Sequence, residues 1–423
     1  MMYSGKREHE RSLFIYVILF LWMGLLGLFG ADSETFAAAG FKQPLLFAAL
    51  VSLGLIAVHL LLEKWRFRGD QFLFPLTSML SVAGLVMILR LEPDYAMRQS
   101  IWLFTGLAAF LATVRLLQNY KRLEDYKYIY ILAALILLLA TILFGVEAGG
   151  ARSWIDLGIA RFQPSEIVKI ILVIFLASYL EEKREVLTEG TRNLWGIPVP
   201  GVQYIGPLLV MWGFSLALLI FQKDLGTALI FFGTFLVMIY ISTGRWSYVL
   251  FGSVLFGFGA TVCYYVFSHV RVRVAIWMNP WADIEGKGYQ IIQSLFALGS
   301  GGTFGTGIGL GQPNLIPAVH TDFVFSAWSE ETGLAGAIAI LIIYCFIIYR
   351  GFRISLAAHT GFGALLAAGL TSLLAVQTLV IVGGVTKLLP LTGVTLPFVS
   401  YGGSSLVSSY IMLGLLMRIS AEG

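Results

Sequence analysis

The sequence predicts an all-α polytopic integral membrane protein. Of its 423 residues, 58% are hydrophobic and only 12% are charged. Soluble domains carry about 25% charged residues, and one soluble core could not bury this much apolar surface. A bilayer can, because lipid replaces water around the outward faces of the helices. The 46 glycines agree, since close helix packing in lipid favours small residues.

About twelve apolar runs have the length that a spanning helix needs, roughly 20 residues. The run at 166–180 is short and carries charges. The first run is longer than the ~7–15 residues of a signal-peptide core, which indicates a retained helix rather than a cleaved signal. The runs lie near 13–30, 45–62, 72–89, 99–117, 127–146, 166–180, 205–221, 226–242, 247–267, 328–349, 361–383 and 398–417.

Basic residues indicate the orientation of these runs. Twelve crossings place the N-terminus, alternate links and the C-terminus on one side, and most flanking Lys and Arg residues lie there. The positive-inside rule assigns this side, and therefore both termini, to the cytoplasm. The exception is the segment 268–327, predicted as a long extracytoplasmic loop, because long translocated loops are poor guides to orientation.

The loop 268–327 is long enough to suggest a function. Residues 289–298 are interpreted as a short amphipathic helix on the membrane surface. Arg271 and Arg273 are spaced to point the same way on a strand, where their guanidinium groups would suit phosphate oxygens. A solvated surface pair is the alternative.

Polar residues beside apolar runs are the most informative ones in a membrane protein. Ser165 is placed to cap a helix that opens at Glu166. Glu166 and Lys169 are three apart, so they share a helix face and can pair. The pair is either a structural ion pair that neutralises itself or a cation held in a cavity for an anionic ligand.

Two aspartates and one motif raise similar alternatives. Asp224, in 222–227, belongs either to a tight polar turn or to the rim of a substrate cavity. Asp322 lies where the outer loop re-enters the membrane, and is either a helix N-cap or a general base. The segment 389–405, with two prolines and several glycines, predicts a re-entrant segment or a kinked helix and turn.

Together these stretches resemble the shape, elongation, division and sporulation family, the FtsW/RodA/SpoVE proteins of bacteria. The resemblance covers roughly residues 72–418 and implies a ten-helix core. Two further N-terminal helices resemble a branch of RodA-like members, giving an N-terminal region of residues 1–71 and a short tail 419–423. The matching motifs are 389–405, 150–158, 161–166, 320–323, 330–333 and 90–93 with Arg98 and Gln99.

The resemblance implies a peptidoglycan glycosyltransferase that polymerises lipid II on the outer face of the bacterial cytoplasmic membrane. It implies Asp322 as the catalytic aspartate. The substrate-binding candidates that it implies are Glu166, Lys169, Asp224, Arg152, His320, Thr321, Ser400, Gly402, Gly403 and Ser404, beside Arg271 and Arg273. The chain departs from the family's usual residues at Lys223, Ala318, Ile381, Lys387 and Ser153, which bears on partner choice and substrate detail.

The mechanism expected is an inverting transfer with Asp322 as the base. The leaving pyrophosphate would be held by Lys169, Arg271, Arg273 or a divalent cation such as Mg²⁺ or Mn²⁺; no cofactor is certain. The resemblance implies a class B penicillin-binding protein transpeptidase as partner, with other elongation or division machinery, and no basic tail suggests nucleic acid.

Three functions remain open at this stage. A lipid II flippase, or another transporter of lipid-linked substrates, would share the many spans and the intramembrane charges. A non-catalytic scaffold for a transpeptidase is the third. Roles in elongation, division and sporulation are not distinguished.

Overall fold

The computed structural model describes residues 7–31, 42–148, 151–156, 158, 161–189, 191–194, 197–200, 206, 213 and 215–422. Among these residues, ten helices are long and apolar enough to cross a membrane, which confirms an all-α polytopic membrane protein. They are α1 (Glu8–Ala31), α3 (Lys42–Lys64), α4 (Leu73–Leu91), α5 (Pro93–Leu116), α7 (Lys127–Phe144), α11 (Leu225–Thr243), α12 (Trp246–Val266), α15 (Val324–Ala357), α16 (Gly361–Val385) and α17 (Gly403–Ser420).

Two expected spans need separate comment. The run at 166–180 is the helix α8 (Pro164–Glu182), which carries acidic residues at both ends and Lys169 within it. The run at 205–221 falls partly outside the described residues, and 215–221 are helical. Short strands also occur between helices, a minor β component that the sequence patterns do not predict.

The chain divides into two compact units. Unit 1 comprises 1–118, 280–350 and 381–423, and unit 2 comprises 119–279 and 351–380. In unit 1 the shorter helices are η1 (Pro280–Asp283), α14 (Tyr289–Ser300) and η2 (Pro313–Leu315). In unit 2 the remaining elements are α6 (Arg122–Asp125), α9 (Arg184–Glu189), α13 (Ser268–Met278), β1 (Val146–Ala148), β2 (Ala151–Asp156), β3 (Arg161–Phe162), β4 (Thr191–Leu194) and β5 (Ile197–Pro200).

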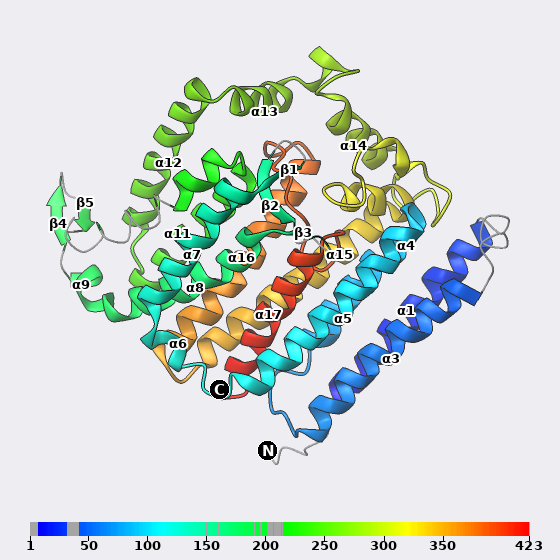
Figure 1. Ribbon diagram of the computed structural model, residues 1–423, viewed down its shortest axis with the longest axis horizontal. Coiled ribbons are helices and arrows are strands. Elements are labelled where there is room, and N and C mark those ends of the chain that lie inside the picture. The colour runs from blue at the N-terminus through cyan, green and yellow to red at the C-terminus, as the bar shows by residue number, and fades with distance from the viewer. Residues whose placement is uncertain are drawn as a thin grey trace. The chain divides into compact units, whose positions relative to one another are not determined.

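In unit 1, α17 packs along α5, α4 packs beside both α1 and α5, and α3 lies next to α1 (Figure 1). Close packing depends on small residues, as expected for helices in lipid. A Cβ at Gly84 in α4 would collide with the carbonyl oxygen of Val399. The C-terminal segment before α17 therefore rests directly on the backbone of α4.

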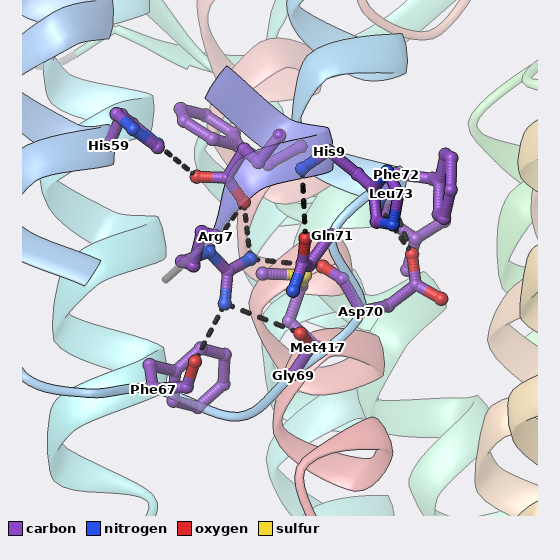
Figure 2. Close-up of polar contacts among 12 residues, drawn as sticks. Arg7, His9, His59, Phe67, Gly69, Asp70, Gln71, Phe72, Leu73 and Met417 are labelled. Carbon is purple, nitrogen blue, oxygen red and sulfur yellow. Dashed lines mark hydrogen bonds and ion pairs between the residues drawn. The ribbon is translucent and has the colours of Figure 1, made fainter. Parts of the chain in front are cut away.

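A buried polar cluster ties the first two helices to the rest of unit 1 (Figure 2). Arg7 Nε donates to Glu10 Oε2 at 2.7 Å, and His59 Nδ1 lies 2.6 Å from Glu10 Oε1. Arg7 also donates to the carbonyl oxygen of Phe67 at 2.8 Å. Because buried charges are stable only when paired, this cluster fixes α1 and α3 against the link that leads into α4.

In unit 2, β1, β2 and β3 form a small antiparallel sheet between α7 and α8 in the sequence. Its register pairs Val146 with Trp154 and Ile155 with Phe162. A second antiparallel pair, β4 and β5, follows α9. These strands belong to links between helices and leave the helical architecture unchanged.

The structure corrects two local predictions and confirms one. Arg271 and Arg273 lie on the helix α13, not on a strand, so residues two apart point to different faces. Ser165 does not cap α8, since the helix begins at Pro164 with Gln163 as its N-cap. The amphipathic helix predicted at 289–298 is α14, with Ile291, Ile292 and Ala297 buried.

Candidate functional site

Asp322 lies in a turn that leads into α15. Thr321 donates through its backbone N–H and its hydroxyl to the carbonyl oxygen of Ala318, at 3.1 and 2.9 Å, and closes this turn. Phe323 is fully buried at the entrance to α15, whereas Asp322 keeps part of its side chain exposed. Asp322 is therefore partly exposed and lies directly beside a buried neighbour.

A break in α15 shapes the loop that precedes this turn. Gly333 has φ +69° inside the helix, and a Cβ there would collide with the backbone of Gly305. The backbone groups that lose their helical partners bond to the loop instead. The N–H of Leu334 donates to Gly302 O at 2.9 Å, and the N–H of Gly307 donates to Glu331 O at 3.0 Å. The loop is thus an extension of the helix hydrogen-bond network.

Charged side chains hold the same loop. Arg90 Nη2 donates to the carbonyl oxygens of Gly309 and Gly311 at 3.2 and 3.1 Å. Its Nε lies 3.2 Å from Oε1 of Glu331, a fully buried carboxylate that also accepts the N–H of Gly309 at 2.9 Å. Glu330 accepts the N–H of Gln312 at 2.8 Å. This ion pair and its hydrogen bonds set the path of the chain toward Asp322.

The C-terminal motif packs beside the Asp322 turn. The N–H of Tyr401 donates to the carbonyl oxygen of His320 at 2.9 Å. Gln99 Nε2 donates to Ser400 O at 3.1 Å, and its Oε1 accepts the N–H of Gly402 at 3.2 Å. The segment 389–402 contains no helix and is largely buried in unit 1, as the re-entrant interpretation expects of irregular backbone.

Four predicted binding residues lie in this motif, and each is held by hydrogen bonds, by close packing or by burial. The hydroxyl of Ser400 accepts the N–H of Leu396 at 2.9 Å. A Cβ at Gly403 would collide with the indole of Trp102. Ser404 is 5% exposed, and the N–H of Gly402 is bound to Gln99. These residues shape the backbone beside Asp322.

Three aromatic rings gather beside the Asp322 turn, and the sequence analysis selected only His320 among them. The ring of Tyr95 lies 4.6 Å from His320 and 4.9 Å from Tyr401, measured between centroids. Burial lowers the pKa of His320 below its ordinary value, although the charge of Glu92 opposes this. No local pattern marks these rings as neighbours, because they come from three distant segments.

In unit 2, Glu166 and Lys169 form the predicted pair within α8. Lys169 Nζ lies 2.8 Å from Glu166 Oε2 and donates to Gln377 Oε1 at 2.9 Å. Both charged residues are buried, at 2% and 5% exposed. Lys169 also lines a pocket of about 20 Å³ whose other walls include Phe175, Phe231 and Leu373. The pocket has room for about one water molecule, so it does not hold a ligand as it stands.

Asp224 is the N-cap of α11. Its Oδ1 accepts the N–H of Thr227 at 3.1 Å, and its Oδ2 accepts the hydroxyl of Thr227 at 2.9 Å and Gln163 Nε2 at 3.4 Å. Burial raises the pKa of Asp224, while the hydrogen bonds from Thr227 lower it. Glu166 raises this pKa and Arg273 lowers it. This geometry fits the tight polar turn.

The remaining cationic candidates also lie in unit 2. The Nε of Arg152 donates to the carbonyl oxygen of Gly145 at 2.8 Å, and its backbone N–H donates to Gln222 O at 3.0 Å. Arg271 is exposed on α13, and Arg273 is half-buried. Within unit 2, Arg273 lies close enough to Asp224 for its charge to lower the pKa of the carboxyl, so two of the predicted residues interact.

Three of the departures from the family's usual residues share one backbone feature. Lys223, Ala318 and Lys387 have φ values of +63°, +51° and +62°. Only glycine adopts this region without cost, so these three side chains lie on strained backbone.

Among the described residues, no group of three or more His, Cys, Asp or Glu side chains is arranged to hold a metal ion. Mg²⁺ that accompanies a diphosphate is commonly bound by one or two carboxylates together with the phosphates.

Comparison with known proteins places this geometry in a family. The FtsW/RodA/SpoVE family model, described as cell cycle protein, matches residues 70–423. Peptidoglycan glycosyltransferase RodA of Mycobacterium tuberculosis (strain ATCC 25618 / H37Rv) is 44% identical over 377 residues, which cover 86% of this chain and 80% of that protein. Stage V sporulation protein E of Bacillus subtilis is 34% identical over 365 residues, covering 83% and 96%.

Solved structures agree. A chain from a study of how a peptidoglycan synthase complex coordinates polymerization and crosslinking matches with a TM-score of 0.70 and 30% identity, covering 83% of this chain and 97% of that one. The rod shape determining protein RodA of Thermus thermophilus matches with a TM-score of 0.61 and 29% identity, covering 83% and 96%. The chain therefore belongs to the FtsW/RodA/SpoVE family of polytopic membrane proteins.

Proposed function

We propose that this protein polymerises lipid II into glycan strands on the outer face of the bacterial cytoplasmic membrane, with Asp322 as the general base. Its family and its relatives named peptidoglycan glycosyltransferases make the chain a peptidoglycan glycosyltransferase. The supporting observation is a partly exposed carboxylate on a turn fixed by buried neighbours, Phe323 and the Arg90–Glu331 pair beyond it.

The reaction makes specific demands on this carboxylate. The 4-hydroxyl of an acceptor sugar attacks the anomeric carbon of the donor, the bond to the pyrophosphate breaks, and the hydroxyl proton passes to Asp322. An α-linked donor gives a β-linked product, so the step inverts and needs a single base on the attacking face. A fixed backbone with an accessible side chain suits such a base, because proton transfer requires hydrogen-bond contact with the substrate.

The departing diphosphate needs positive charge. Arg271, exposed on α13, has the guanidinium geometry that suits phosphate oxygens. Lys169 is a weaker candidate, since Glu166 already compensates its charge at 2.8 Å. A substrate-borne Mg²⁺ or Mn²⁺ would supply the same electrostatic stabilisation when bound.

The proposal is tested by adding lipid II to the purified protein in detergent and following glycan strand formation on gels. Detergent removes the second compartment, so strands require an enzyme and cannot come from a flippase. We expect strands from the protein, with a chelator arm that reports a divalent-ion requirement. Absence of strands under every condition, including addition of a class B penicillin-binding protein, would contradict the proposal.

A partner is included in the proposal. The structural match to a chain of a peptidoglycan synthase complex supports assembly with a penicillin-binding protein that crosslinks the strands. Co-purification of the two proteins, and a higher polymerisation rate in the complex, are the expected results. If the strands formed only with the partner and Asp322→Ala had no effect, the scaffold interpretation would replace ours.

A further inference from the structure

Three aromatic side chains from distant regions of unit 1 meet at the Asp322 turn. Tyr95 lies in the first turn of α5, His320 lies two residues before Asp322, and Tyr401 precedes α17. The three centroids lie 4.6, 4.9 and 5.7 Å apart, for the pairs Tyr95–His320, Tyr95–Tyr401 and His320–Tyr401. These separations lie in the range in which rings contact one another.

The backbone beneath these rings is fixed. The N–H of Tyr401 donates to the carbonyl oxygen of His320 at 2.9 Å. The side chain of Gln99, buried in α5, bonds to the backbone on both sides of Tyr401, through Ser400 and Gly402. A ligand that stacked on these rings would therefore meet a preformed surface and lose little free energy to ordering.

The exposure of the rings distinguishes them from core packing. Phe74 and Phe110 stack in the same unit with centroids 5.1 Å apart, and both are fully buried. Tyr95, His320 and Tyr401 instead each keep part of their surface exposed. A cluster that served only the core would lie inside it, as the Phe pair does.

The edge of the cluster is charged. Arg98 is exposed, its guanidinium carbon lies 6.0 Å from the centroid of the Tyr95 ring, and its charge lowers the pKa of Tyr401 against the larger effect of burial. Glu92 is exposed and close enough to influence His320. A pyranose ring has an apolar C–H face that stacks on aromatic rings, and hydroxyls at its edge that bond to charged groups. The cluster offers both kinds of contact.

We propose that Tyr95, His320 and Tyr401 form a stacking platform that binds a sugar ring of the acceptor glycan beside Asp322. This inference rests on the proposed function, because the acceptor is the substrate whose hydroxyl Asp322 deprotonates.

The test measures saccharide binding separately from catalysis. The probe is a lipid-free tetrasaccharide of alternating N-acetylglucosamine and N-acetylmuramic acid, titrated into the full-length protein in detergent by calorimetry. Tyr95→Ala and Tyr401→Ala are each expected to raise the Kd of the tetrasaccharide about tenfold. Tyr401→Phe keeps the ring, so its Kd should stay within about twofold of the wild-type value. Tyr128→Ala, at a ring that is 57% exposed in α7, is the matched control with no change.

Lipid II kinetics on the same variants give the second readout. The Ala variants should raise KM about tenfold and keep kcat within about threefold, because they remove binding and leave the base in place. Equal thermal midpoints for Tyr401→Phe and Tyr401→Ala exclude misfolding as the cause. Unchanged Kd and KM in both Ala variants, or a loss confined to kcat, would overturn the platform.

The outcomes separate the two proposals. Tetrasaccharide binding that depends on Tyr401, in a protein that makes no strands, would support the platform and contradict the proposed polymerase. Strand synthesis with tetrasaccharide binding that is insensitive to Tyr95 and Tyr401 would support the polymerase and overturn the platform.

Discussion

Asp224 and Asp322 are both aspartates just before a membrane helix, and they differ in burial and in their position relative to the helix start. Asp224 is 7% exposed, and its carboxylate oxygens accept hydrogen bonds from the N–H and the hydroxyl of Thr227. Asp322 is partly exposed and lies two residues before α15, beyond the cap position. A carboxylate committed to a helix end stabilises the fold, whereas one held beside a fixed turn can exchange a proton with a substrate. Stability and rate should therefore respond to different residues.

The largest effect is expected from changing the two aspartates in parallel. Asp322→Asn should lower the rate of strand synthesis by about 10²–10⁴-fold, the usual contribution of a general base, with an unchanged unfolding midpoint. Asp224→Asn should keep the rate within about threefold, because Asn can still cap a helix. Gel-based time courses with matched protein amounts measure both. Comparable rates for the two variants would remove the distinction.

Lys169→Met extends the comparison to a third carboxylate, Glu166, whose charge is compensated by the buried ammonium of Lys169. Removal of the ammonium leaves Glu166 buried without its partner, which typically costs about 3–5 kcal/mol. The double variant Lys169→Met/Glu166→Gln should recover some of this loss, because no uncompensated charge remains. Thermal unfolding in detergent measures both variants. If Lys169→Met kept wild-type stability but had no activity, Lys169 would instead be assigned a role in binding the substrate.

Arg90→Met tests the ion pair that positions the loop before Asp322. Glu331 would lose its cation, and we expect a loss of about 3 kcal/mol, since Arg90 is not fully buried. The strand synthesis rate should fall as the loop loosens, and Glu331→Gln in the same chain should restore some of the stability. Arg115→Met, at an exposed residue of α5, is the control. Equal behaviour of the Arg90 and Arg115 variants would contradict the positioning role.

Asp224→Ala should have a smaller effect. Loss of the cap to the Thr227 N–H typically costs about 1 kcal/mol, with the rate little changed. Thr227→Val, which removes only the hydroxyl hydrogen bond, should cost less. Denaturation of the two variants side by side gives the order. A larger loss from Thr227→Val would mean that the hydroxyl, not the helix cap, dominates.

His320 predicts the smallest effect, a pH dependence of stability. Burial lowers its folded pKa, so the unfolded chain binds more protons between that value and the ordinary value of about 6.5. Stability should therefore fall as the pH drops through this window. The change should be less than about 1 kcal/mol, because the ring is half-exposed and solvent screens its charge. His320→Gln should flatten that slope in unfolding midpoints at pH 7.5 and 5.5. An unchanged slope would contradict the assignment to His320.

The sequence was sufficient for the long apolar helices, since long apolar runs admit few other structures. It was insufficient for contacts between segments that are far apart in the sequence. Nothing local joins Arg90 to Glu331, or Tyr95 to Tyr401, because these contacts form only when helices pack. The alternation around Arg271 suits a strand, but the chain forms a helix that directly follows α12. At Ser165, the proline before it moved the start of the helix.

The dependence of the polymerisation rate on pH, measured for the wild type and Asp322→Asn, tests the central claim most directly. A base must be ionised to accept the proton, so the wild-type rate should fall in acid. The residual rate of Asp322→Asn should lack that fall. The same acid limb in both proteins, or a wild-type rate in Asp322→Asn, would show that another group takes the proton.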